Sequence, residues 1–412
     1  MSNSFEIQQV AVIGAGTMGR GIVVSLASAG LSVLWLENNA ATLDAGLTMI
    51  EQTWAQQVDK QRITQAQADD NLRRVRPVAD YASLADADLV IEAVYENLEI
   101  KQAIFRELDA HLKPRAILAS NTSALDIDSI AAVTGRAEQV LGLHFFSPAH
   151  IMKLLEIVRG KHTDSAVLHA AQALGQRIGK VAVIAGNCPG FIGNRMLRSY
   201  VAEARKLLLE GALPYEVDEA LQQFGFAMGP FRMYDVVGID LEWRARQLAG
   251  QGMEAPLVQI DNALCELGRL GQKTGQGYYR YAPGSRKAEH DPQVDALVLK
   301  VSHGLGYRRR AIDAQEILER CLLALINEGA KILEEGIAAN SHDIDQVWIN
   351  GYGFPAEIGG PMAWADSQGL NAIGARLERL QQVLGEHWRP AALIGQLSAR
   401  NKHFGEVAGE LA

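Results

Sequence analysis

The stretch VAVIGAGTMGRGIVVSLASAGLSVLWLE, from Val10 to Glu37, decides the fold expected for this chain. A short apolar run, Val10–Ile13, is followed by a glycine-rich turn and then by an apolar-striped segment that stops at Gly30. A second apolar run, 31–36, ends in an acid. This order predicts a strand, a tight turn, a helix and a second strand.

Three glycines of the turn have separate roles in such a unit. Gly14 permits the tight turn, Gly16 lets a pyrophosphate approach the backbone, and Gly19 lets the helix pack closely against the strand. The N–H groups at the helix start then face the phosphates. The pattern predicts a Rossmann-type dinucleotide-binding domain. The alternative is a glycine turn in an α/β core that binds no ligand.

Glu37 indicates which dinucleotide would bind. A carboxylate at the tip of the second strand accepts hydrogen bonds from a ribose diol and repels a 2′-phosphate. Asn38 and Asn39 follow it, rather than an arginine. The sequence therefore favours NAD over NADP.

The composition indicates a globular protein with more than one domain. A chain of 412 residues is too long for one ordinary core. The net charge of −9 argues against general nucleic-acid or membrane-surface binding. The 3 cysteines are widely spaced and indicate neither a metal site nor a disulfide framework. We find no signal peptide or membrane span in the sequence and expect a cytoplasmic protein.

Polar side chains follow two predicted strands, at the ends where open α/β sheets bind ligands. Glu96 comes after the apolar run 89–94, and Ser123 comes after the run 116–119. Ser123 has the alternative role of capping the next helix. Lys101 lies in the first turn of the helix between these runs and reaches either the cofactor or only water.

Two apolar runs, 140–146 and 152–158, each carry one ionisable residue near the middle, His144 and Glu156. A lone histidine in an apolar run is more often a hydrogen-bonded core residue than a catalyst. A buried carboxylate needs a partner, however, and sequential strands often pair. Glu156 beside His144 would fix the imidazole tautomer and raise its basicity, as a general base requires.

Three further polar residues have two interpretations each. Thr53 and Lys60 share one face of a predicted helix, which is either solvated surface or a contact for an anionic substrate tail. Asn194 lies one turn into the helix that follows the hinge 186–190. It is either solvated or holds a substrate carbonyl.

The second half of the chain contains an internal repeat. EARKLLLEG (Glu203–Gly211) matches EGAKILEEG (Glu328–Gly336), and a second matching pair of segments follows. Duplicated helical units can pack as a pseudo-dimer within one chain. Asn194 falls on Glu319 in this alignment, so we expect one active site and a structural second copy.

These features predict an α/β Rossmann-type N-terminal domain followed by an all-α C-terminal region of two repeated helical domains. The predicted boundaries are 1–186 for the NAD-binding domain, 187–290 for the first helical domain and 291–412 for the second.

Nearly the whole chain resembles the L-3-hydroxyacyl-CoA dehydrogenases of fatty-acid β-oxidation. The shared motifs are GAGTMGRGI, SNTSAL, GLHFFSPAHIMKLLEIV, CPGFIGNR, MGPF and KTGQGYY. The resemblance is greatest to the dehydrogenase portion of bifunctional enoyl-CoA hydratase/dehydrogenases, which carry two C-terminal helical repeats; the hydratase half has no counterpart here. It implies NAD-dependent oxidation of (S)-3-hydroxyacyl-CoA to 3-oxoacyl-CoA.

The resemblance implies four catalytic roles. His144 would be the general base and Glu156 its orienting partner. Ser123 would hydrogen-bond the substrate hydroxyl or the histidine. Asn194 would hold the thioester end of the substrate.

The resemblance also implies binding positions. Thr53 and Lys60 fall at coenzyme A contacts, and no metal is expected. The residues expected to surround NAD are Gly14, Gly16, Met18, Gly19, Glu37, Glu96, Lys101, Ser123, Ser147 and Lys273.

Three positions depart from the usual family pattern. Ser147 stands where many relatives have asparagine, Glu37 replaces a common aspartate, and Asn350 stands where some bifunctional relatives have tyrosine. The first change predicts a shorter or water-mediated nicotinamide contact.

Two other functions stay open at this point. One is an NAD-dependent dehydrogenase of a free hydroxy acid, and the other is a non-catalytic NAD-binding subunit. The expected partner is the acyl-CoA substrate, with no nucleic acid and no membrane. We expect a monomer with an intrachain pseudo-dimer or a homodimer, with a separate enoyl-CoA hydratase as a further candidate partner.

Overall fold

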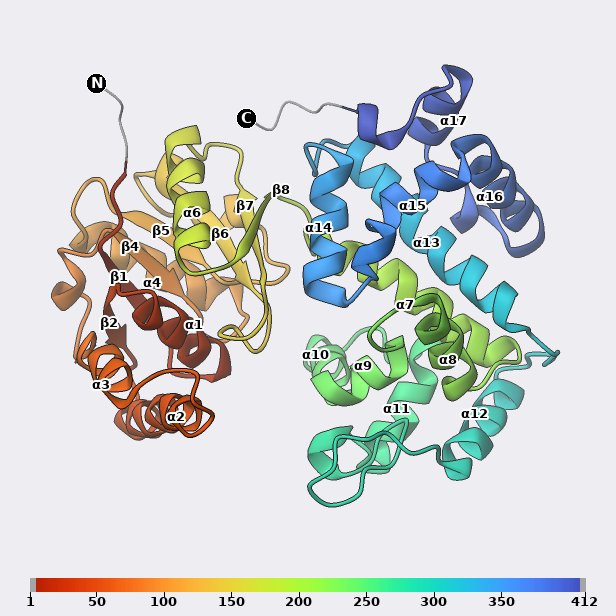
Figure 1. Ribbon diagram of the computed structural model, residues 1–412, viewed down its shortest axis with the longest axis horizontal. Helices are drawn as coiled ribbons and strands as arrows, with labels where there is room; N and C mark the ends of the chain where they lie inside the picture. The colour runs from red at the N-terminus through yellow and green to blue at the C-terminus, as the bar shows by residue number, and fades with distance from the viewer. Residues whose placement is uncertain (1–4, 408–412) are drawn as a thin grey trace. The chain divides into compact units, whose positions relative to one another are not determined.

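The computed structural model describes residues 5–407 of the chain, which form two compact units (Figure 1). The sheet unit contains the described residues up to 195, together with 332–352 and 404–407. The helical unit contains residues 196–331 and 353–403. Each unit is described by itself.

The sheet unit is built on an 8-stranded sheet with the strand order β3-β2-β1-β4-β5-β6-β7-β8. Neighbouring strands in this sheet are parallel except β6 and β7, which are antiparallel. The strands are β1 (Gln9–Ile13), β2 (Ser32–Leu36), β3 (Val75–Val78), β4 (Leu89–Glu92), β5 (Ile117–Ser120), β6 (Val140–Phe145), β7 (Leu154–Arg159) and β8 (Val181–Gly186).

The order of the strands creates the position for a ligand. The chain moves outward from β1 to β2 and β3, and then returns to place β4 on the other side of β1. The carboxyl ends of β1 and β4 therefore diverge at a topological switch point, where open α/β sheets bind their ligands.

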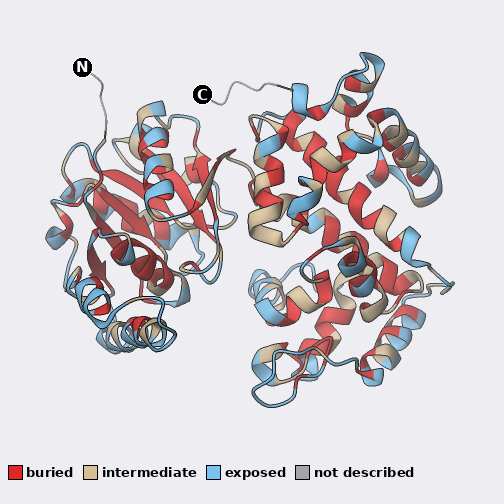
Figure 2. Cartoon of the chain, viewed as in Figure 1, coloured by how far each residue is buried: buried red, intermediate tan, exposed pale blue. Residues whose placement is uncertain are grey.

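Helices cover this sheet, and its strands β1, β4, β5 and β6 are almost entirely buried (Figure 2). The helices of the sheet unit are α1 (Thr17–Ser28), α2 (Ala40–Asp59), α3 (Gln65–Arg73), α4 (Leu98–His111), α5 (Ile127–Ala131), α6 (Ser165–Arg177) and α14 (Ser341–Tyr352).

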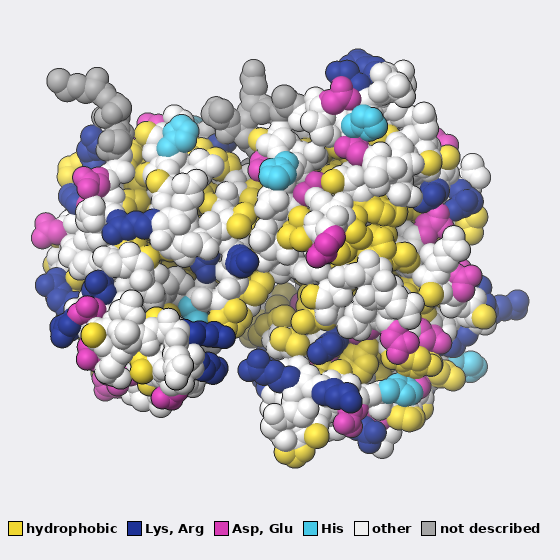
Figure 3. Space-filling model, in the orientation of Figure 1, with side chains coloured by type: hydrophobic (Ala, Val, Ile, Leu, Met, Phe, Trp, Pro, Cys, Tyr) yellow, Lys and Arg dark blue, Asp and Glu magenta, His cyan; other side chains and the backbone are white. Residues whose placement is uncertain are grey.

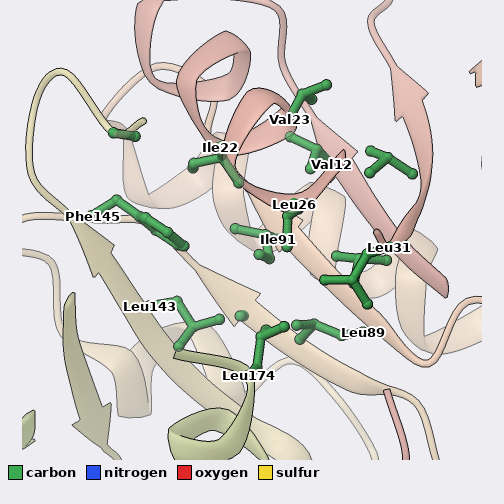
Figure 4. Packing of buried hydrophobic residues seen from close by; sticks show 14 of the residues in the cluster. Val12, Ile22, Val23, Leu26, Leu31, Leu89, Ile91, Leu143, Phe145 and Leu174 are labelled. Carbon is green, nitrogen blue, oxygen red and sulfur yellow. The ribbon is translucent and has the colours of Figure 1, made fainter. Parts of the chain in front are cut away.

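The first helix packs on the sheet through its apolar stripe. Ile22 and Leu26 of α1 face Val12 of β1, Ile91 of β4 and Phe145 of β6 (Figure 4). All five side chains are buried. This packing fixes the start of α1 against the carboxyl end of β1, because the two are joined by only the glycine turn.

The predicted strands are present. The apolar runs read from the sequence form β1, β2, β4, β5, β6 and β7, with ends that shift by a few residues. Between α2 and α3, Thr64 and Gln67 form a capping box that starts the second of these helices.

The helical unit contains helices from both copies of the repeat. Helix α7 begins in the sheet unit and α13 ends in it. The helices are α7 (Gly193–Glu210), α8 (Pro214–Phe224), α9 (Pro230–Val237), α10 (Asp240–Ala249), α11 (Gln259–Glu266), α12 (Pro292–Gly304), α13 (Ala314–Glu334), α15 (Pro361–Gln368), α16 (Leu370–Leu384) and α17 (Ala392–Ala399).

An aromatic cluster joins the two copies inside the helical unit. Phe226 from the first copy meets Phe354 from the second, with ring centroids 5.1 Å apart and planes at 72°. Phe224 packs edge-on against Phe354 and Trp364. Duplicated helices thus bury faces that one copy would leave exposed.

Acidic and basic side chains are interspersed over the face shown in Figure 3. No single sign of charge dominates that face. Among the described residues, we find no helix with the length and apolar character needed to cross a bilayer.

Candidate active site

The glycine turn between β1 and α1 has the shape that a dinucleotide requires. Gly14 has a φ of +106°, and a Cβ there would lie 2.7 Å from the carbonyl oxygen of Ala93. A Cβ on Gly19 would overlap the carbonyl oxygen of Gly14. A Cβ on Gly16, by contrast, would meet nothing within 4 Å. Space is therefore open at the one glycine over which a pyrophosphate would lie.

Glu37 lies beside this turn. Its Oε2 accepts a hydrogen bond from the backbone N–H of Ala15 at 2.9 Å, and its Oε1 accepts one from the N–H of Asn39 at 3.1 Å. The carboxylate is thereby held at the tip of β2, next to the open side of the turn. An acid therefore lies where the sequence predicts a carboxylate that binds the ribose, and the residues fit NAD.

A buried carboxylate that the sequence analysis did not identify stands at the end of β4. Glu92 is fully buried and pairs with Nζ of Lys101 at 2.6 Å. It also accepts hydrogen bonds from Oγ of Ser120 at 2.8 Å and from the N–H of Val94 at 2.7 Å. Lys101 is 1% exposed, so its ammonium group holds two loops at the sheet edge rather than lying in water. One sequence signal could have identified this pair. It is an acid at the end of an apolar strand, followed by a lysine on the next helix.

Glu96 connects the loops that follow β4 and β5. Its Oε1 accepts hydrogen bonds from Oγ1 of Thr122 at 2.5 Å and from the N–H of Ser123 at 3.0 Å. Lys101 lies 3.4 Å from its other oxygen. Glu96, Lys101 and Ser123 are therefore brought together, as expected for polar residues at the ends of neighbouring strands.

His144 and Glu156 are direct partners across the antiparallel strands β6 and β7. Nδ1 of His144 lies 2.8 Å from Oε2 of Glu156, and both residues are buried. Because a carboxylate only accepts hydrogen bonds, Nδ1 carries the proton and Nε2 is the basic nitrogen. The predicted adjacency of the two residues is confirmed.

The second oxygen of Glu156 has a function that the sequence did not indicate. Oε1 accepts hydrogen bonds from the backbone N–H groups of Ile192 at 3.2 Å and Gly193 at 2.9 Å. These groups open α7, which carries Asn194. One buried carboxylate therefore fixes both the imidazole and the start of this helix.

Asn194 lies against the loop that carries Ser123. Its Nδ2 donates to the backbone oxygen of Ser123 at 3.4 Å, and its Oδ1 accepts a hydrogen bond from Oη of Tyr352 at 2.9 Å. The four residues predicted to be catalytic, His144, Glu156, Ser123 and Asn194, thus lie within one linked group in the sheet unit.

Other predicted binding residues lie outside this group. Ser147 is exposed on the loop after β6, and Met18 is half-buried in the first turn of α1. On α2, Oγ1 of Thr53 donates to the carbonyl of Met49 at 2.8 Å, and Lys60 is exposed at the end of the helix.

Lys273 belongs to the helical unit, where it pairs with the buried Asp240. Its loop is held by a second buried acid, Asp235, which accepts hydrogen bonds from the N–H groups of Tyr278 at 2.8 Å and Tyr279 at 2.9 Å. Burial raises the pKa of Asp235 to about 6. A Cβ on Gly277 would overlap this carboxylate, which explains the second glycine of the KTGQGYY motif.

No group of three or more potential metal ligands occurs among the residues that the structure describes. The three cysteines are unpaired thiols, and Cys265 and Cys321 are buried. The linked group of His144, Glu156, Ser123 and Asn194 contains a histidine, a carboxylate, a hydroxyl and an amide.

Comparison with known families and structures agrees with this geometry. The sequence model described as "3-hydroxyacyl-CoA dehydrogenase, NAD binding domain" matches residues 9–188. The model described as "3-hydroxyacyl-CoA dehydrogenase, C-terminal domain" matches twice, at residues 190–281 and 317–410. The double match coincides with the internal repeat.

Named relatives are similar over almost the whole chain. A peroxisomal bifunctional enzyme of Danio rerio is 44% identical over 96% of this chain and 56% of its own length. A fatty acid oxidation complex subunit alpha of Psychrobacter sp. is 36% identical over 98% of this chain and 56% of its own length. The chain therefore spans about half the length of the curated relatives it matches.

A solved structure is similar over nearly the full length of both chains. The 3-hydroxybutyryl-CoA dehydrogenase of Escherichia coli K12 has a TM-score of 0.82 and 30% identity, covering 96% of this chain and 99% of that one. Taken with the sequence matches, this shows that the chain belongs to the 3-hydroxyacyl-CoA dehydrogenase family.

Proposed function

We propose that this chain catalyses the NAD-dependent oxidation of a (S)-3-hydroxyacyl-CoA to the 3-oxoacyl-CoA. The observation that carries the proposal is the buried His144–Glu156 pair, hydrogen-bonded to the helix start that presents Asn194. Membership of the family, the open glycine turn and the acid at the tip of β2 support NAD as the cofactor.

The histidine moves the proton. Nε2 of His144 takes the proton of the substrate hydroxyl, the O–H bond breaks, and its electrons form the new C=O bond. Glu156 stabilises the resulting imidazolium, so the base is strengthened where charge develops. NAD, when bound, supplies the acceptor for the hydride that leaves the carbinol carbon. In the reverse reduction, the imidazolium returns the proton.

The remaining residues of the group hold the substrate and cofactor. Asn194 is proposed to hold the thioester end of the substrate, and Ser123 to hydrogen-bond its hydroxyl or the histidine. Thr53 and Lys60 are proposed coenzyme A contacts, supported by their shared helical face. The proposed NAD contacts are Gly14, Gly16, Met18, Gly19, Glu37, Glu96, Lys101, Ser123, Ser147 and Lys273.

Removal of the base tests the proposal. His144→Gln should lower turnover of NADH with acetoacetyl-CoA by at least about a hundredfold, since general-base catalysis contributes about two to four orders of magnitude. The affinity for NAD, measured by calorimetry, should stay close to that of the unchanged protein. His169→Gln, an exposed residue of α6, is the matched control and should be fully active.

Three results would contradict the proposal. A loss of only severalfold in His144→Gln would show that another group is the base. Turnover of free acetoacetate at the rate of acetoacetyl-CoA would favour a dehydrogenase of free hydroxy acids. An absence of acyl-CoA-dependent NADH oxidation would favour a non-catalytic NAD-binding subunit.

The assembly and location are parts of the same proposal. We propose a division into domains 1–186, 187–290 and 291–412 and a monomer in which the two helical copies replace a dimer. A homodimer is the alternative, to be distinguished by sedimentation. A separate enoyl-CoA hydratase is a candidate partner. A cytoplasmic location stays a prediction, and several relatives have names that place them in peroxisomes instead.

A further inference from the structure

Tyr352 brings the second helical copy to the catalytic group. It is the last residue of α14, which comes from the second copy but belongs to the sheet unit, together with β6 and β7. Its Oη lies 2.9 Å from Oδ1 of Asn194. A tyrosine at this position has no counterpart in the roles expected from the sequence, where the second copy was assigned only a structural role.

The hydrogen bonds at the two ends of the Asn194 amide fix its direction. The backbone oxygen of Ser123 is only an acceptor, so the nitrogen of the amide must point toward it. The amide oxygen then points toward Tyr352, whose hydroxyl must be the donor. Without this donor, the restraint on the amide oxygen described here would be lost.

The ring of Tyr352 is held on several sides. It stacks on Trp348, with centroids 4.7 Å apart, and meets Phe146 edge-on at 5.7 Å. Gly193 provides room for it, because a Cβ there would lie 2.6 Å from Oη. Phe146 in turn lies 4.4 Å from the ring of His144. The hydroxyl is therefore presented by a rigid aromatic group next to the catalytic pair.

We infer that Tyr352 is a positioning residue, supplied by the second helical copy, which orients the Asn194 amide for the thioester end of the substrate. The inference rests on the proposed function of Asn194. It makes the second copy part of the active site rather than only its support.

Tyr352→Phe tests the inference, because it removes the hydroxyl and keeps the ring that packs on Trp348 and Phe146. We expect kcat/KM for acetoacetyl-CoA to fall by about fivefold to tenfold, the effect of one lost hydrogen bond. The KM for NADH should not change. The shape of the pH profile should also be unchanged, since the His144–Glu156 pair is untouched.

Tyr234→Phe is the matched control. The Tyr234 hydroxyl donates to Glu242 at 2.7 Å in the helical unit, so its removal also deletes one tyrosine–acceptor hydrogen bond. We expect thermal stability to change in this variant while kcat/KM for acetoacetyl-CoA stays unchanged.

A double-mutant cycle decides whether Tyr352 acts through Asn194. In an Asn194→Ala background, Tyr352→Phe should cause no further loss of kcat/KM. An equal loss in both backgrounds, or no loss in the unchanged background, would overturn the inference while leaving the proposed function intact. An unchanged protein without acyl-CoA-dependent turnover would overturn the proposed function, and this inference with it.

Discussion

At the scale of single residues, Glu156 carries more of the site than its sequence position indicated. One oxygen holds the imidazole of His144, and the other holds the backbone at Gly193. The first contact was predictable, because two consecutive apolar strands with one polar residue each tend to pair those residues. The second contact joins a strand to a helix 37 residues later, and no local pattern encodes it.

This double role makes Glu156→Gln a sharp test. The two backbone N–H groups at Ile192 and Gly193 require an acceptor, so the new side chain should turn its oxygen toward them. Its NH₂ group then faces Nδ1 of His144 and forces the imidazole proton onto Nε2. We expect kcat to fall by about two to four orders of magnitude, because the base is protonated on the wrong nitrogen.

The measurement for Glu156→Gln is steady-state oxidation of a (S)-3-hydroxyacyl-CoA with NAD, the direction in which His144 acts as the base, together with circular dichroism. The fold should be retained, because the acceptor for α7 is kept. Full activity in this variant would show that Glu156 is only a structural acid.

At the scale of elements, the turn between β1 and α1 contains one glycine that the fold requires and another that cofactor binding requires. Gly19 is required by packing, since a Cβ would overlap the backbone of Gly14. Gly16 has an ordinary extended backbone, with φ −70° and ψ −173°, and open space around it. The fold itself therefore does not require a glycine at position 16, whereas a pyrophosphate on the backbone does.

Gly16→Ala should accordingly lose cofactor binding without losing stability. We expect the affinity for NAD to fall by about tenfold to a hundredfold, the effect of an added methyl group in a closely packed contact. The free energy of unfolding should change by less than about 1 kcal/mol. Calorimetric titration with NAD and urea unfolding measure the two quantities.

Two alanine substitutions complete this test. Gly19→Ala should lower the free energy of unfolding by about 1–3 kcal/mol through overpacking. Gly304→Ala, at the end of α12 with nothing within 4 Å of its Cβ, should affect neither quantity adversely. Unchanged NAD binding in Gly16→Ala would show that the pyrophosphate does not lie over this turn.

The individual strands were more predictable from the sequence than the packing of one element against another. Period and composition identified six strands, because these features follow from local backbone and burial preferences. The membership of α14 in the sheet unit was not predictable. Its contacts with β7 and β8 depend on how the second copy folds back, and Tyr352 was missed for that reason.

At the scale of the whole molecule, two equivalent ion pairs link the duplicated copies. In the repeat alignment, Arg195 falls on Arg320, and Glu210 falls on Glu335. Arg195 pairs with Glu335 at 2.5 Å in the sheet unit, and Arg320 pairs with Glu210 at 2.6 Å in the helical unit. Each arginine therefore binds the glutamate of the other copy, which is the reciprocity of a two-fold interface.

The two equivalent pairs differ in burial, and this difference predicts their energies. Arg320 is fully buried and also binds Glu203 at 2.5 Å, whereas Glu335 is half exposed. Arg320→Met should lower the free energy of unfolding by about 3–5 kcal/mol, because it leaves a buried acid without its partner. Arg195→Met, the symmetry-equivalent control, should lower it by about 1 kcal/mol or less.

The loss of unfolding free energy in Arg320→Met should also depend on pH. The burial of Glu203 determines whether the loss grows or shrinks as pH rises. Burial raises the pKa of Glu203, and Arg320 opposes that rise. Without Arg320, the folded variant keeps a proton on Glu203 at pH values where the unfolded chain releases it, so rising pH favours unfolding. Urea unfolding followed by circular dichroism should therefore show a larger loss at pH 8 than at pH 5.5. An equal loss at both pH values, or an equal loss in Arg195→Met, would mean that Arg320 stabilises the repeat by packing and not by neutralising buried acids.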